Sequence, residues 1–175
     1  MDTKMTPESA LPDAAQSDPL LMGWMVGSPP PPEKLVRFAD GSMLKFPQNR
    51  WANSNYRTLV PTKNISRGSG LVAPLPRADR SDLDAVTFVP IGSSENMTWA
   101  ESLSANYTDG IVVLHKGHIV YERYRGALDA DTPHIAFSVT KSFIGTIAAC
   151  LVHEGLLDDT ANVAHYVPEL GKSAF

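Results

Sequence analysis

The chain has 175 residues, of which 43% are hydrophobic and 19% charged, so it is long enough to bury a core and its composition excludes a disordered protein. Its formal net charge of −4, without a long basic run, argues against nucleic acid as a partner. The first twenty residues carry acids and prolines where a signal peptide needs a basic start and an apolar run, and no segment approaches the length of a membrane span. We therefore expect a cytoplasmic protein that does not contact a membrane.

Residues 1–95 have the composition of an extended arm. Their first part is polar, and residues 27–33 (GSPPPPE) are typical of an extended polyproline turn. Further prolines break the apolar pattern between Leu35 and Pro90. We expect residues 1–95 to be an N-terminal extension that packs on a second domain, of which residues 96–175 form the first part.

Regular secondary structure is predicted from residue 98 onward. Residues 98–106 fit a short helix capped by Asn96 or Thr98. Residues 111–115 and 118–124 are rich in β-branched and aromatic side chains and are separated by Lys-Gly, which predicts an antiparallel hairpin. The first strand is apolar on both faces, so we expect it to be buried on both sides.

Residues 138–154 give the strongest helical signal in the chain. Apolar side chains recur at helical spacing on more than one face, and Gly155 follows as a stop signal. A helix that is apolar nearly all round is expected to lie inside a larger protein. Cys150 lies within this stretch, and we interpret it as a packed core thiol rather than a reactive nucleophile.

Two Ser-x-x-Lys sequences occur, at Ser42–Lys45 and at Ser138–Lys141. The first follows an Asp-Gly turn, and Pro47 prevents a helix soon after it, so we interpret it as a coincidence. The second opens the long apolar helix. Residues at i and i+3 lie on one helix face, about one turn apart.

A serine and a lysine in that arrangement can perform nucleophilic catalysis. A lysine held on a buried helix loses hydration, so its neutral amine becomes accessible and can accept the serine proton. The backbone N–H of Ser138, at the helix N-terminus, can stabilise an oxyanion. The pattern alone also fits a simpler interpretation, in which Ser138 only caps the helix and Lys141 is a solvated cation.

The surrounding motifs resemble a known family. The sequence of residues 135–146 (IAFSVTKSFIGT), with 153–158 (HEGLLD) and 166–170 (YVPEL), resembles the serine β-lactamase and penicillin-binding superfamily. Within it, the best resemblance is to the 6-aminohexanoate-dimer hydrolases, also called nylon-oligomer hydrolases. Those proteins have an N-terminal arm similar to residues 47–52, 59–62 and 65–67, whereas β-lactamases lack it.

The resemblance implies an α/β fold of the β-lactamase/transpeptidase type, with a mainly antiparallel sheet flanked by helices, incomplete in this chain. It implies a serine hydrolase without a cofactor that forms an acyl-enzyme at Ser138 with Lys141 as activator. The preferred substrates are linear 6-aminohexanoate oligomers or similar amides, with esterase activity toward short acyl esters. Two alternatives stay open: a β-lactamase or D-alanyl-D-alanine peptidase, and a truncated, non-catalytic module that binds a partner.

Family members are considerably longer and carry a catalytic tyrosine in a Tyr-x-x-Asn-like motif, with a second oxyanion donor, in their later part. Tyr121, Tyr124 and Tyr166 do not stand in such a motif. We therefore expect a C-terminal polypeptide of the same hydrolase as a partner, and the family suggests a homodimer.

The histidines do not predict a metal site. His115 and His118 flank the hairpin turn, and we expect them on different faces of the sheet, without a third ligand.

Overall fold

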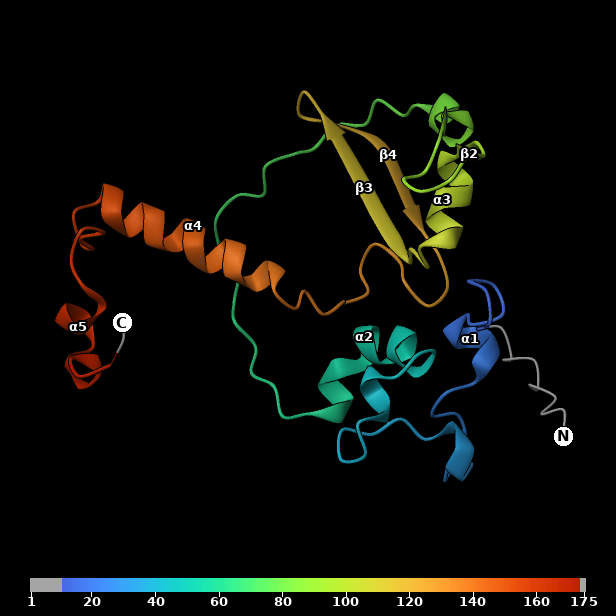
Figure 1. The fold of residues 1–175 in the computed structure, drawn as a ribbon, viewed down its shortest axis with the longest axis horizontal. Coiled ribbons are helices and arrows are strands. Elements are labelled where there is room, and N and C mark those ends of the chain that lie inside the picture. The colour runs from blue at the N-terminus through green and yellow to red at the C-terminus, as the bar shows by residue number, and fades with distance from the viewer. Residues whose placement is uncertain (1–10, 174–175) are drawn as a thin grey trace, which may run out of the picture. The chain divides into compact units, whose positions relative to one another are not determined.

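The structure, a computed structural model, describes residues 11–173 (Figure 1). The described residues divide into two compact units, one that ends at residue 135 and one that begins at residue 136. Its elements are, in chain order, α1 (Pro19–Met22), η1 (Pro32–Lys34), η2 (Ser42–Leu44), α2 (Gln48–Leu59), η3 (Ser81–Ala85), β1 (Thr87–Phe88), β2 (Met97–Thr98), α3 (Trp99–Ala105), β3 (Gly110–His115), β4 (His118–Tyr124), α4 (Val139–His153), α5 (Val163–Tyr166) and η4 (Pro168–Leu170). Within the described residues, no helix combines the length and the apolar character that crossing a membrane requires.

The first unit contains a small core that the sequence pattern does not predict. Its buried members are Trp24, Val36, Met43 and Ala52. Helix α2 contributes Ala52 to this core, and Tyr56 and Leu59 pack against the core beyond a kink at Asn55, where φ is −118° and ψ is 18°. The remaining residues of α2 are mostly polar, so the proline-broken segment conceals a helix of 12 residues.

Arg50 ties this helix to two distant segments. The side chain is only 7% exposed, and its guanidinium donates to the backbone carbonyl of Ala14 at 2.6 Å and to the hydroxyl of Ser17 at 2.7 Å. It also forms an ion pair with Asp109, which directly precedes β3. One buried cation thus holds the N-terminal segment, α2 and the start of the hairpin together.

The predicted helix and hairpin are both confirmed. Thr98 caps α3, and its hydroxyl and the Glu101 carboxylate form a reciprocal capping box. Strands β3 and β4 pair antiparallel, with His115 opposite His118. Lys116 and Gly117 both have positive φ, +50° and +78°, as a type I′ two-residue turn requires.

The expectation that β3 is buried on both faces is wrong for the residues described. On one face, Tyr121 of β4, the cross-strand partner of Val113, packs edge-to-face against Trp99 of α3, and the two ring centroids lie 6.2 Å apart. On the other face, Val112 and Leu114 are 53% and 51% exposed. Only residues distant in sequence could cover the second face, and the periodicity of a strand does not identify them.

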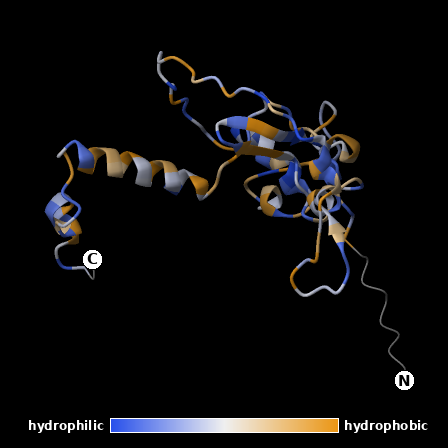
Figure 2. Ribbon diagram, turned by 90° about the horizontal axis from the view of Figure 1, so that it is seen from above, coloured by the Kyte–Doolittle hydropathy of each residue, from blue (hydrophilic) through white to orange (hydrophobic). Residues whose placement is uncertain are grey.

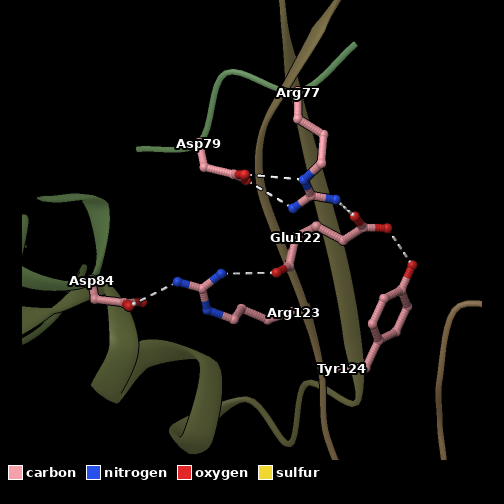
Figure 3. A network of polar contacts seen from close by, with 6 residues as sticks. All are labelled: Arg77, Asp79, Asp84, Glu122, Arg123 and Tyr124. Atoms are coloured by element: carbon pink, nitrogen blue, oxygen red, sulfur yellow. Dashed lines mark hydrogen bonds and ion pairs between the residues drawn. The ribbon is translucent and has the colours of Figure 1, made fainter. Parts of the chain in front are cut away.

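The edge of β4 that does not pair with β3 is joined by part of the N-terminal extension (residues 1–95). Residues 76–80 run beside it, with backbone hydrogen bonds of 2.9 Å from Ala78 to Ile119 and from Arg80 to Val120, and a parallel bridge between Arg77 and Ile119. Figure 3 shows the side chains that reinforce this contact. Arg77 donates to both carboxylate oxygens of Asp79 and forms an ion pair with Glu122 of β4. The hydroxyl of Tyr124 and the guanidinium of Arg77 both donate to Glu122 and keep its pKa below the usual range.

The second unit consists of α4, α5 and η4. Helix α4 contains no buried residue, and Figure 2 shows apolar residues along it. Its exposed large apolar side chains are Val139, Phe143, Ile144, Ile147 and Leu151. Cys150 is exposed as well, so the interpretation of this residue as a packed thiol is wrong for the described structure. The physical reason is that periodicity identifies an apolar face but not the surface that covers it.

Candidate active site

Helix α4 begins and ends as its sequence predicts. At its C-terminus, Gly155 has a φ of +71°, and its N–H donates to the carbonyl of Val152 at 3.0 Å. The N–H of Leu156 donates to the carbonyl of Leu151 at 2.9 Å. These two bonds form a Schellman motif, for which glycine is favoured because it adopts the left-handed conformation without strain. The helix is therefore a defined element of 15 residues that starts directly after Ser138.

Ser138 and Lys141 are brought together by this helix. The Nζ atom of Lys141 lies 2.9 Å from the Oγ atom of Ser138, within hydrogen-bonding distance. Ser138 occupies the cap position but its side chain makes no capping hydrogen bond. Its hydroxyl is thus directed to the lysine rather than to the helix backbone, and the capping interpretation of the sequence pattern does not describe it.

The first turn of α4 leaves one backbone donor without a partner. The N–H groups of Val139, Thr140 and Lys141 donate to the carbonyls three residues earlier, at 3.0, 3.1 and 3.0 Å. Within residues 11–173, no hydrogen bond is formed by the N–H of Ser138. That N–H group is free to donate a hydrogen bond to an anionic oxygen, which is the role expected of it from the sequence.

Both side chains of the pair are exposed, as is every residue of the helix's first two turns. The dehydrated lysine environment expected from the sequence is therefore not formed by the described residues. The hydrogen-bonding distance between Ser138 and Lys141 is thus formed, whereas removal of water from the two side chains would require further protein atoms packed over α4.

The other Ser-x-x-Lys sequence has a different structure. Ser42 opens the 3₁₀ turn η2, where its hydroxyl accepts a hydrogen bond from the N–H of Arg37 at 2.8 Å. Its own N–H donates to the side chain of Asp40 at 2.9 Å. Within the part of the chain that is described, no hydrogen bond joins Lys45 to the Ser42 hydroxyl. Ser42 thus stabilises a turn, as the sequence context indicates.

The tyrosines near these elements already have partners. Tyr121 is buried and donates to Asp84 at 2.5 Å, and burial together with that carboxylate raises its pKa. The carboxylate of Glu122 likewise raises the pKa of Tyr124. The hydroxyl of Tyr166 accepts a hydrogen bond from the N–H of Asp158 at 2.7 Å. Each of these three hydroxyl groups takes part in a local hydrogen bond of the described structure.

The histidine pair requires a correction. His115 and His118 are cross-strand partners, so their side chains share one face of the hairpin instead of lying on different faces. The expectation treated the two residues as members of one strand, whereas the turn between them reverses the chain. Among residues 11–173, no group of three histidine, cysteine, aspartate or glutamate side chains is arranged to hold a metal ion.

Comparison with known proteins gives consistent matches. Residues 102–175 match the family model described as "Beta-lactamase". The 6-aminohexanoate-dimer hydrolase of Paenarthrobacter ureafaciens is 31% identical over 134 residues, which cover 77% of this chain and 32% of that protein. A solved structure, "Putative 6-aminohexanoate-dimer hydrolase from Bacillus anthracis", matches with a TM-score of 0.65 and 29% identity, over 73% of this chain and 32% of the other. The chain thus spans about a third of the length of these relatives.

Proposed function

The chain belongs to the beta-lactamase family, and we propose that it carries the nucleophile of a serine hydrolase that cleaves amide bonds in linear 6-aminohexanoate oligomers. The family and the α/β fold expected from the sequence are confirmed by these matches. The observation that carries the proposal is the 2.9 Å contact between Lys141 Nζ and Ser138 Oγ at the start of α4, inside the matched region. The substrate class is taken from the names of the two relatives.

The proposed reaction uses Ser138 as nucleophile. Its Oγ attacks the amide carbonyl carbon while the neutral amine of Lys141 takes the hydroxyl proton. The carbonyl oxygen becomes an oxyanion and accepts a hydrogen bond from the Ser138 N–H. The C–N bond then breaks, the leaving amine receives the proton that Lys141 took from the serine, and the acyl group stays on Ser138. Water hydrolyses this ester and regenerates the free serine. Short acyl esters can enter the same pathway, because an alcohol leaves more readily than an amine.

We propose that further polypeptide of the same hydrolase completes the site. A lysine amine acts as a base only in its neutral form, which loss of hydration favours. Helix α4 exposes Phe143, Ile144 and Ile147 by 65%, 61% and 55%, which offers an apolar surface for such cover. The same cover would bring in the further proton carrier that the family resemblance implies.

The test is Ser138→Ala in the full-length protein, with Ser42→Ala as a matched control from the other Ser-x-x-Lys sequence. Hydrolysis of the linear 6-aminohexanoate dimer and of a p-nitrophenyl ester should fall on the order of 10⁴-fold in Ser138→Ala. Ser42→Ala should keep nearly full activity. Mass spectrometry should find an acyl adduct on Ser138 during ester turnover. Unchanged hydrolysis by Ser138→Ala would show that Ser138 is not the nucleophile.

A further inference from the structure

The N-terminal extension makes a direct backbone contact with the segment that leads to the candidate nucleophile. The N–H of Ile135 donates a hydrogen bond of 2.8 Å to the carbonyl of Asn53 in α2. Ile135 lies three residues before Ser138, and consecutive Cα atoms of a chain are about 3.8 Å apart. The Cα atom of Ser138 therefore lies no more than about 11 Å from that of the residue that α2 holds. Helix α2 thus fixes one end of the short segment that carries the nucleophile.

Helix α2 is bent next to this contact. Asn55, two residues after Asn53, departs from helical geometry, with φ −118° and ψ 18°. Its side-chain amide donates to the carbonyl of Trp51 at 2.8 Å, the acceptor that the backbone N–H of Asn55 would use in a regular helix. A side chain that competes for the carbonyl four residues earlier bends a helix. The Asn55 side chain accounts for the bend, since α2 contains neither proline nor glycine.

The bend affects what the carbonyl of Asn53 can bind. In a straight α-helix, that carbonyl points along the axis to the N–H four residues later, which belongs to Arg57. Asn55 lies between these two residues, so its non-helical backbone changes the direction of the helix across this hydrogen bond. A carbonyl oxygen has two lone pairs, and at a bend it becomes open to a donor outside the helix. Ile135 supplies that donor.

Both sides of this contact are anchored to the hairpin. On the α2 side, the buried guanidinium of Arg50 pairs with the carboxylate of Asp109, directly before β3. On the other side, the loop that leads from β4 to Ile135 begins with Arg125, whose N–H donates to the carbonyl of Asp109 at 2.7 Å. The hydrogen bond to Asn53 holds the end of the same loop. The loop is therefore fixed at both ends, and α2 provides the anchor nearer to the nucleophile.

We infer that Asn55 is a positioning residue for the nucleophile: by bending α2, it presents the Asn53 carbonyl to the segment that carries Ser138. The inference rests on the proposed function of Ser138 and gives the N-terminal extension a part in the same reaction. Asn55 acts through the backbone of α2 rather than on the substrate. Activity should therefore depend on whether the side chain at position 55 can donate a hydrogen bond to the carbonyl of Trp51.

Three variants of the full-length protein test this donor. Asn55→Ala removes it and favours a straight helix, and Asn55→Asp keeps the size of the side chain but offers no donor at neutral pH. Both should lower kcat on the order of 10²-fold with little change in KM, as expected when a reacting group is misplaced by about 1 Å. Asn55→Ser can still donate to the carbonyl of Trp51, so it should keep kcat within a few-fold of the wild type. Arg57→Ala, an exposed change in the same helix, is the matched control and should be silent.

Hydrogen exchange at the Ile135 amide gives a measurement that does not depend on catalysis. Exchange should be slow in the wild type and in Asn55→Ser, and faster in Asn55→Ala and Asn55→Asp. Free exchange of this amide in the wild type would overturn the inference, and this result does not require any variant to fold. Normal kcat in both Asn55→Ala and Asn55→Asp would also overturn it, even with a lowered Tm, because the role of Asn55 would then be structural only.

Ser138→Ala, assayed in parallel, separates this inference from the proposed function. Full activity in Ser138→Ala would overturn both together. An inactive Ser138→Ala with normal kcat in Asn55→Ala and Asn55→Asp would overturn the inference alone.

Discussion

Replacing Lys141 with arginine tests whether the lysine transfers a proton or only donates a hydrogen bond. The Nζ–Oγ distance of 2.9 Å is compatible with either role. Arginine keeps the positive charge and can still donate to Ser138, but it cannot be deprotonated in a protein. A lysine that acts as a base contributes roughly 10²–10⁴-fold to the rate, or about 2.7–5.4 kcal/mol of barrier. A lysine that only donates should be replaced by arginine at a cost of less than about tenfold, because the charged hydrogen bond is retained.

The assay is ester and amide hydrolysis by the full-length protein, with Lys141→Ala and Lys45→Arg as the comparison variants. We expect Lys141→Arg to lose nearly as much kcat as Lys141→Ala. Lys45→Arg should be nearly silent, because Lys45 follows the serine of the turn-forming sequence. Circular dichroism should show that helix α4 is intact in all three. An arginine variant that keeps most of its activity would refute the base role and assign the proton transfer to another group.

Three further predictions concern stability and solubility. Asp109→Ala leaves the guanidinium of Arg50 buried without its carboxylate, so it should cost about 3–5 kcal/mol in chemical unfolding, and a loss below about 1 kcal/mol would contradict the buried pair. The pKa of Glu122 is depressed in the folded protein, so its contribution to stability is present above the ordinary glutamate pKa of about 4.3 and is lost as the pH falls through the lower folded value. Glu122→Gln should therefore weaken the fall in the free energy of unfolding at acid pH. An unchanged pH dependence would exclude a contribution from the contacts of Glu122 with Tyr124 and Arg77. Residues 1–175 expressed alone should aggregate or bind a hydrophobic dye through α4, and Ile147→Lys should reduce that binding; a monodisperse chain without dye binding would mean that the apolar face is covered internally.

Local sequence determined the elements that hold the candidate site. The two-residue turn at Lys116–Gly117, the capping box of Thr98 and the glycine after α4 each act within a few residues of where they lie. The Ser138–Lys141 contact belongs to the same class, since a spacing of three residues on a helix brings two side chains together in any surroundings. Phe137 carries no such signal: its φ is +41°, a conformation that glycine or asparagine normally marks in a sequence.

Tertiary structure decided the rest, because it depends on contacts between distant residues. Helix α2 is mostly polar, and its few apolar residues can be recognised as core residues only from their packing around Trp24. The ion pair of Arg50 with Asp109 spans 59 positions of the chain, and the pairing of residues 76–80 with β4 joins an arm without regular strand signal to a hairpin edge. Burial follows the same rule. The sequence marks Cys150 and the faces of α4 as apolar, but whether they are covered depends on surface supplied from elsewhere in the fold, since the free energy of burial belongs to the contact and not to the residue.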